Sequence, residues 1–251
     1  MHYAVVGCIQ ANADALKAVL ADIRARGIDR IVCLGDVIGF GPDPLECIDL
    51  VRKHCFMFVR GDHDQAMLEG SVGFTPKTAK ILDWTRALVE GGDPAVVQAR
   101  RAFFEGALDS FNSAGIGFVH GSPRSCHEYL FPSDVQRDPR KLRAGFAATE
   151  KVTFFANTQV PGVIMEEPLS WHTAQELEGF FHYRKGMKAL VCVGSVGQPR
   201  DGDCRACYLE IDKNRMYWRR VEYDLTRVVQ RLDALPEVFS SDFAIRLQKG
   251  R

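Results

Sequence analysis

The first sixty residues alternate between short apolar runs and longer amphipathic segments, and this alternation strongly restricts the fold. The apolar runs have the length of buried strands and occupy residues 2–7, 30–36 and 55–64. Residues 12–26 carry apolar side chains at helical spacing, with Asn12 placed to cap the helix and Gly27 to end it. Pro44 opens a second predicted helix over residues 44–54. Alternation of strands and helices in this order predicts a parallel sheet with right-handed crossovers.

The remainder of the chain divides into a helical part and a strand-rich part. Residues 67–111 read as a helical insertion, with helices expected over 75–92 and 93–106. Strand-like runs follow at 114–122, 151–157, 161–165, 177–184, 188–195, 205–212 and 215–223. Short turns between many of these runs predict an antiparallel or mixed sheet. Residues 224–250 read as helix, proline break and helix, and residues 1–251 are interpreted as one domain.

Charge and cysteine content restrict the partners and the compartment. Lys+Arg and Asp+Glu both number 32, so nothing in the charge balance favours a nucleic acid or an anionic membrane as partner. No apolar run approaches the roughly 18 residues that a membrane span needs, and no secretory signal is visible. The eight cysteines lie mostly in apolar runs, which predicts reduced thiols and a cytoplasmic protein.

Polar residues follow several of the predicted strands at the point where each strand ends. The side chains with metal-binding or acid–base chemistry are Asp36, Asp62, His63, Asp64 and His120. In open α/β sheets, ligands bind in the crevice at the carboxyl ends of the strands, so these side chains are expected to converge. Carboxylates and imidazoles together suit a divalent ion such as Mn, Fe or Zn.

The order and spacing of these loops resemble those of the calcineurin-like metallophosphoesterases, and most closely the compact bacterial and archaeal members. The matching stretches are CLGDVIGFGPDPLECIDLVR (33–52), VRGDHD (59–64), FVHGSP (118–123), ANTQVPG (156–162) and GSVGQPRDGDCRACYLEID (194–212). The resemblance covers nearly the whole chain. It implies an α/β fold, a four-layer α/β/β/α sandwich of two mixed sheets with helices outside.

The resemblance also implies a two-metal site, and this sequence departs from it at one of the two centres. Enzymes of this kind use two ions about 3.5–4 Å apart to activate water and to hold the phosphoryl oxygens. The first centre corresponds to positions 8, 10, 36 and 159, where the family has an Asp and two His in place of Cys8, Gln10 and Gln159. Only Asp36, which bridges both centres, keeps its ligand type there, so a second ion is not expected.

The other centre keeps most of its ligand character. Its positions hold Asp36, Asp62, His120 and Asn157, and carboxylate, imidazole and amide groups together can bind one Mn, Fe or Zn ion. The alternative is a metal-free polar pocket in which Asp36 and Asp62 pair with an arginine. Arg60 and Arg200 are the candidates.

The resemblance assigns roles to three further residues. His63 would face the leaving group, Asp64 would orient His63, and Arg200 would contact the phosphate. Two functions remain open at this point. The first is hydrolysis of phosphate mono- or diesters with weak activity. The second is a catalytically inactive pseudoenzyme that binds a phosphorylated small molecule or a phosphoprotein. Neither the substrate nor the oligomeric state follows from the sequence.

Overall fold

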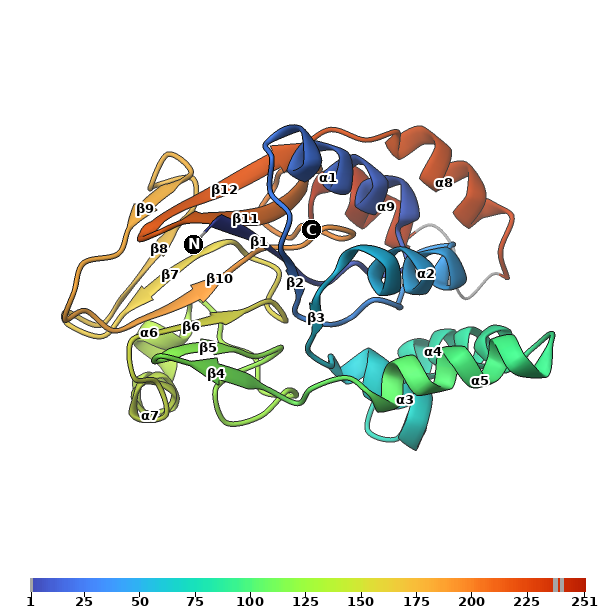
Figure 1. The fold of residues 1–251 in the computed structure, drawn as a ribbon, viewed down its shortest axis with the longest axis horizontal. Coiled ribbons are helices and arrows are strands. Elements are labelled where there is room, and N and C mark those ends of the chain that lie inside the picture. Colours follow the sequence, from blue (N-terminus) through green and yellow to red (C-terminus); the bar gives the residue numbers. More distant parts are fainter. Residues whose placement is uncertain (1, 237–238, 240–241) are drawn as a thin grey trace.

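A computed structural model of the chain describes residues 2–236, 239 and 242–251 and contains two mixed sheets packed face to face (Figure 1). The first sheet has the order β3-β2-β1-β11-β12-β9, with strands β1 (His2–Val6), β2 (Ile31–Cys33), β3 (Met57–Phe58), β9 (Phe180–His182), β11 (Ala206–Asp212) and β12 (Arg215–Val221). The second has the order β4-β5-β6-β10-β7-β8, with β4 (Phe111–Ser113), β5 (Ile116–Phe118), β6 (Val152–Phe155), β7 (Gly162–Met165), β8 (Ser170–Thr173) and β10 (Ala189–Cys192).

Helices flank the two sheets. They are α1 (Ala13–Ala25), α2 (Pro44–His54), α3 (Asp62–Glu69), α4 (Pro76–Val89), α5 (Pro94–Glu105), α6 (Asp134–Arg137), α7 (Pro139–Ala147), α8 (Leu225–Asp233) and α9 (Asp242–Lys249). In the part of the chain that the structure describes, no helix has the length and apolar character needed to cross a bilayer.

Alternation of side chains along the strands produces three apolar layers. In β1, Val5 packs into the core between the two sheets, whereas its neighbour Val6 packs toward α1 and α2. In β10, Val191 enters the same central core, and Cys192 faces the layer beneath α7. The inner strands β1 and β10 therefore pack on both faces, and the predicted four-layer α/β/β/α sandwich is confirmed.

Local signals explain where the best-predicted helix begins and ends. The Asn12 side chain accepts a hydrogen bond from the Ala15 amide at 3.1 Å, which caps α1 as expected. Gly27 has a φ of 68°, a left-handed conformation that glycine adopts without steric cost. Strands β4 and β8 and helices α6 and α7 were not indicated by the sequence patterns.

One predicted strand is wrong in its second half. The run at 55–64 forms only the two-residue strand β3, and α3 already begins at Asp62. The carboxylate of Asp64, at the third helical position, accepts a hydrogen bond from the Gly61 amide at 2.9 Å. This side-chain contact satisfies a free amide at the helix N-terminus and turns the chain into a helix at that point.

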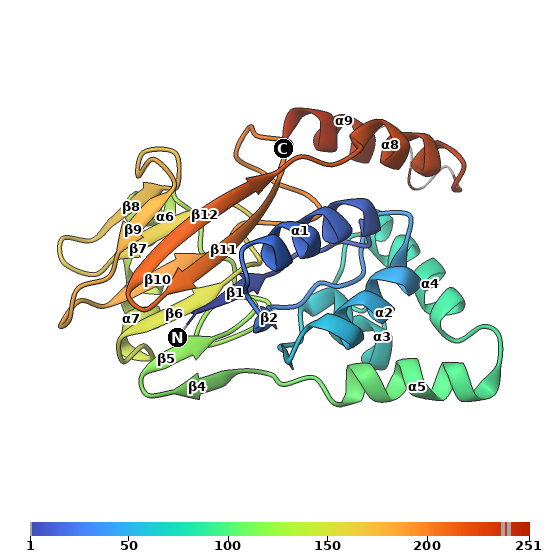
Figure 2. The same ribbon diagram turned by 45° about the horizontal axis from the view of Figure 1, so that its top comes forward.

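Residues 67–111 include the end of α3 together with α4 and α5, and the C-terminal helices pack against this region. Ile81 of α4 lies in one apolar cluster with Phe243 of α9, and Trp84 stacks edge-on against Phe239 with ring centroids 4.7 Å apart. Figure 2 shows α8 and α9 on the same side of the molecule as α1. The predicted proline break lies partly outside the described residues. The division of residues 1–251 into one domain with an insertion stays a prediction.

Candidate metal centre

Left-handed turns at the ends of the strands aim several polar side chains into one crevice. Positive φ angles occur at Cys8 (48°), Gln10 (55°), Asp36 (52°) and Gln159 (63°), all of them non-glycine residues. This conformation costs an L-residue roughly 1–2 kcal/mol, so the surrounding contacts must hold these turns in place. At Gly35 an added Cβ would collide with the backbone of the 61–64 loop, which shows how closely the loops approach one another.

Asp64 ties two of these loops together through backbone amides. Its buried carboxylate accepts hydrogen bonds from the amides of Asp36 (2.7 Å), Val37 (2.9 Å) and Gly61 (2.9 Å). Burial, followed by the charge of Asp36, raises the pKa of Asp64 to about 6. In the described part of the chain no hydrogen bond joins Asp64 to the His63 imidazole. Asp64 thus positions the loop of His63 and Asp36, whereas the sequence predicted that it orients the His63 ring.

Two carboxylates and one imidazole form a buried cluster at the base of the crevice. Nδ1 of His120 donates to the Leu34 carbonyl oxygen at 2.5 Å, which turns Nε2 toward the carboxylates. Nε2 lies 3.4 Å from Oδ1 of Asp36 and 3.5 Å from Oδ1 of Asp62. Oδ1 of Asp36 also accepts the His63 amide at 3.1 Å. These groups therefore come together from loops that are far apart in the sequence, as expected for the ends of parallel strands.

The charged groups of this cluster shift one another's pKa values. Burial and the neighbouring Asp62 raise the pKa of Asp36 to about 8. Burial alone would lower the pKa of His120, but Asp36 and Asp62 outweigh it and raise that pKa to about 10. Burial opposes the charge of Asp62 as well, yet the hydrogen bond and charge of His120 hold its pKa below the ordinary value. A protonated imidazole thus balances part of the buried negative charge, a role that a bound cation would also fill.

Asn157 adds a neutral oxygen beside this cluster. Its backbone amide donates to the His120 carbonyl oxygen at 3.0 Å, and its side-chain Nδ2 donates to the Cys126 carbonyl oxygen at 3.1 Å. These contacts leave Oδ1 of Asn157 buried without a hydrogen-bond partner, while Nε2 of His120 faces the carboxylates of Asp36 and Asp62. Buried polar atoms normally find a partner, so an unpaired oxygen next to two carboxylates and an imidazole fits the coordination of one divalent ion.

The positions that correspond to the first centre have a different environment. Nε2 of Gln10 donates to Oδ2 of Asp36 at 2.8 Å and occupies an oxygen that a bridging carboxylate would offer to a metal. With its amide oriented to satisfy both ends, Gln159 donates to the Gln198 carbonyl oxygen at 2.6 Å and accepts from Nη2 of Arg200 at 3.3 Å. Both glutamines therefore make hydrogen bonds within the protein, and Oε1 of Gln10 stays buried without a partner.

Cys8 shows a conflict between geometry and protonation. Sγ of Cys8, a carboxylate oxygen of Asp36 and a ring nitrogen of His120 lie within 4.8 Å of one another, close enough to share an ion. Burial, followed by the charge of Asp36, raises the pKa of the Cys8 thiol well above its ordinary value. A metal binds the thiolate, so the raised pKa opposes ligation by Cys8 in the absence of a bound cation. The side chain also packs in the core between the sheets, where a free cysteine behaves as a small apolar residue.

Neither candidate arginine pairs with the buried carboxylates. Arg60 donates to the Ala107 carbonyl oxygen at 3.1 Å and lies 3.8 Å from Oδ1 of Asp109. Arg200 donates to Oε1 of Gln198 at 3.3 Å. The cation beside the carboxylates of Asp36 and Asp62 is His120, so the expected arginine pairing is absent from the described contacts.

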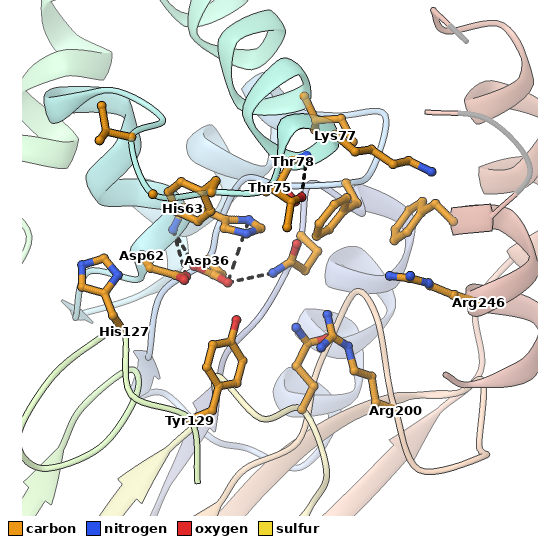
Figure 3. A pocket seen from close by; sticks show the side chains of 18 residues that line it. Asp36, Asp62, His63, Thr75, Lys77, Thr78, His127, Tyr129, Arg200 and Arg246 are labelled. Atoms are coloured by element: carbon orange, nitrogen blue, oxygen red, sulfur yellow. Dashed lines mark hydrogen bonds and ion pairs between the residues drawn. The ribbon is translucent and has the colours of Figure 1, made fainter. Parts of the chain in front are cut away.

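A cavity of about 770 Å³ opens in front of the cluster (Figure 3). Its inner wall contains residues that the sequence singled out, namely Gln10, Asp36, Asp62, His63, Gln159 and Arg200. Its outer wall contains residues that sequence patterns did not indicate, among them Phe40, Phe74, His127, Phe243 and Arg246. Tyr129 also lies there, in the stretch EYLFP (128–132), which follows the His120 loop as in the family that the sequence resembles. Phe243 and Arg246 had no sequence signal, because α9 reaches the site only through tertiary packing.

Comparison with known proteins identifies the class to which this fold and site belong. The calcineurin-like phosphoesterase family model matches residues 1–192. The uncharacterized protein MJ0912 of Methanocaldococcus jannaschii is 32% identical over 243 residues, which cover 93% of each chain. The crystal structure of a metallophosphoesterase from Sphaerobacter thermophilus superposes with a TM-score of 0.81 at 30% identity, covering 100% of this chain and 99% of that one.

A more distant structure shares the fold alone. The hypothetical protein PH1004 of Pyrococcus horikoshii has a TM-score of 0.71 at 18% identity, over 100% of this chain and 98% of that one. Taken with the family match, these similarities show that the chain belongs to the calcineurin-like phosphoesterases, a metal-dependent family of hydrolases.

Proposed function

We propose that this protein is a phosphoric ester hydrolase that works slowly with a single divalent ion. The observation that carries the proposal is the contrast between the two halves of the site. One half keeps the carboxylates of Asp36 and Asp62, the imidazole of His120 that faces them, and the unpaired Oδ1 of Asn157. The other half has only the neutral amides of Gln10 and Gln159 beside Asp36, and Gln10 already donates to Oδ2 of that carboxylate.

The proposed ligands are Asp36, Asp62, His120 and Asn157, which fit one Mn, Fe or Zn ion. When bound, such an ion polarises a phosphoryl oxygen and lowers the pKa of a bound water. His63 lines the cavity in front of Asp36, and its buried Nδ1 has no hydrogen-bond partner. Burial lowers the pKa of His63, so the imidazole is neutral near pH 7 and can donate one hydrogen bond to the leaving-group oxygen.

Hydrolysis of p-nitrophenyl phosphate and its bis-ester tests this proposal. We expect slow turnover that requires Mn²⁺, stops on addition of EDTA and is abolished in Asp36→Ala. Bound metal without any turnover of either ester would contradict the hydrolase. That result would favour the second candidate, an inactive protein that binds a phosphorylated small molecule or a phosphoprotein. The Gln10 hydrogen bond on Asp36 is the observation that favours this second candidate. Brisk wild-type turnover that is lost in Asp36→Ala would overturn this second candidate.

We also propose a reducing, cytoplasmic location. All eight cysteines are free, and five of them are buried. Buried, unpaired thiols are ordinary in a reducing compartment and uncommon in secreted proteins, where paired cysteines stabilise the fold.

Metal content should be at most one Mn, Fe or Zn ion per chain. One centre keeps two carboxylates, an imidazole and an unpaired amide oxygen, while the other has, besides Asp36, a thiol with a raised pKa and two neutral amides. Elemental analysis after dialysis against excess Mn²⁺ checks this, and Asp62→Ala should reduce the content toward zero. Two tightly bound ions per wild-type chain would show that Cys8, Gln10 and Gln159 still form a working centre.

Arg200 is proposed to contact the phosphate, and Arg200→Gln should raise KM for p-nitrophenyl phosphate about tenfold. Hydrogen bonds to charged groups contribute roughly 1.5–3 kcal/mol, and the partners of Arg200 among the described residues are neutral amides. Steady-state kinetics measure the change. Arg227→Gln, which removes an exposed arginine of α8, is the matched control and should leave KM unchanged. An Arg200→Gln protein with wild-type KM would remove Arg200 from the phosphate site.

A further inference from the structure

An aromatic wall leads from His63 toward the outer end of the cavity. The His63 ring lies 5.4 Å from the ring of Phe40 and 5.6 Å from that of Phe74, both edge-on. Phe40 in turn lies 5.6 Å from Phe243 of α9 with tilted rings. These four rings come from the loop after β2, from α3, from the segment before α4 and from α9. They line one continuous cavity and offer a planar ring offset-stacked or edge-on contacts.

Two guanidinium groups line the same cavity without a carboxylate partner. Arg200 contacts only neutral amides, and among the described residues no carboxylate pairs with Arg246 of α9. Arg231, by contrast, pairs with both Asp14 and Asp43. Figure 3 shows Arg200 and Arg246 directed into the cavity from the side opposite His127. Guanidinium groups that lack an internal partner and face a cavity are suited to bind phosphate oxygens in pairs.

The size of the cavity also exceeds what a small phosphate ester needs. About 770 Å³ lies in the range of pockets that enclose drug-sized ligands, roughly 300–1,000 Å³. A single phosphoryl group at Asp36 and Asp62 would leave the aromatic wall and Arg246 without contacts. The outer half of the cavity therefore has room for a ring and for a second negative charge.

We infer that the cavity receives a small phosphate compound that combines a planar aromatic ring with a second anionic group, the chemistry of a nucleoside diphosphate. The inference rests on the proposed function, which places one phosphoryl group beside Asp36, Asp62 and Arg200. Arg246 holds the second anion, and Phe40, Phe74 and Phe243 contact the ring. Three of these side chains, Phe74, Phe243 and Arg246, come from the segment before α4 and from α9, outside the loops that carry the metal ligands, whereas Phe40 comes from the loop of Asp36.

Calorimetric titration of the purified protein with three non-hydrolysable ligands tests the inference. Adenosine 5′-(α,β-methylene)diphosphate has both a ring and two anions, methylenediphosphonate has two anions only, and phenylphosphonate has a ring and one anion. We expect the adenosine compound to bind at least about tenfold more tightly than either of the others. Binding of methylenediphosphonate or phenylphosphonate within about threefold of the adenosine compound would overturn the inference.

Variants separate the two features of the ligand. Arg246→Gln should weaken the adenosine compound about tenfold and leave phenylphosphonate unchanged. Phe74→Leu, at a partly buried position, should weaken both ring compounds and leave methylenediphosphonate unchanged. Arg227→Gln, an exposed arginine outside the cavity, should alter none of them. An Arg246→Gln protein that behaves like Arg227→Gln would remove the second anion site.

Binding and turnover distinguish this inference from the proposed function. The binding pattern without hydrolysis of any ester would leave the inference standing and reject the hydrolase. Hydrolysis without the binding pattern would support the hydrolase and reject the aromatic, doubly charged ligand.

Discussion

The combined replacement Cys8→Asp, Gln10→His, Asn157→His and Gln159→His should raise kcat/KM for p-nitrophenyl phosphate about 100-fold in the presence of Mn²⁺. This corresponds to roughly 2.7 kcal/mol of transition-state stabilisation, within reach of a second ion that activates water and clamps the phosphoryl oxygens. Replacing Gln10 also removes its hydrogen bond to Oδ2 of Asp36 and frees that oxygen for coordination. Metal content should rise to two ions per chain.

Two controls define this result. Asp36→Ala in the quadruple variant should abolish the gain, because Asp36 is the residue common to both centres. Gln10→His alone should change the rate little, since one imidazole cannot hold a second ion. The quadruple variant also places a carboxylate in the buried site of Cys8, so its Tm should fall in EDTA and recover with Mn²⁺. Two bound ions without a rate increase would show that ligand loss is not what limits turnover.

Asp64→Ala should lower the free energy of unfolding by about 3–5 kcal/mol. The substitution leaves three buried backbone amides, those of Asp36, Val37 and Gly61, without an acceptor, and each unsatisfied group costs roughly 1–3 kcal/mol. Urea denaturation in EDTA measures the change without a contribution from bound metal. Asp64→Asn, which keeps one acceptor oxygen, should lower the free energy of unfolding by less than Asp64→Ala does.

The matched control for Asp64 is Asp29→Ala, because Asp29 is exposed in the loop between α1 and β2. Its substitution should change the unfolding free energy by less than about 0.5 kcal/mol. A similar effect at both positions would mean that the Asp64 carboxylate does not tie the two loops together.

Much of the fold could be predicted because its signals are local. Asn12, Gly27 and Pro44 mark helix ends by their own chemistry, and the apolar runs between them have strand length. The convergence of Asp36 with His120 could also be anticipated, because the ends of parallel strands meet at one edge of a sheet. Residues that mark helix ends, together with the geometry of the sheet, therefore account for the inner half of the site.

The outer half could not be predicted in the same way. Phe243 and Arg246 reach the cavity because α9 packs against α4 through Ile81, a contact between segments more than 150 residues apart. The early start of α3 depends on a hydrogen bond from Gly61 to Asp64, which competes with strand propensity in the preceding residues. Both features arise from interactions that hydrophobic periodicity does not encode.

The left-handed turns at Cys8, Gln10 and Gln159 have a cost that the rest of the fold must offset. Glycine adopts this backbone without steric cost and asparagine with little, whereas cysteine and glutamine are strained in it. Contacts such as the Gln10 hydrogen bond to Oδ2 of Asp36 hold these side chains in place despite the strain. The strand ends therefore present their side chains to the crevice at the expense of some of the stability of the fold.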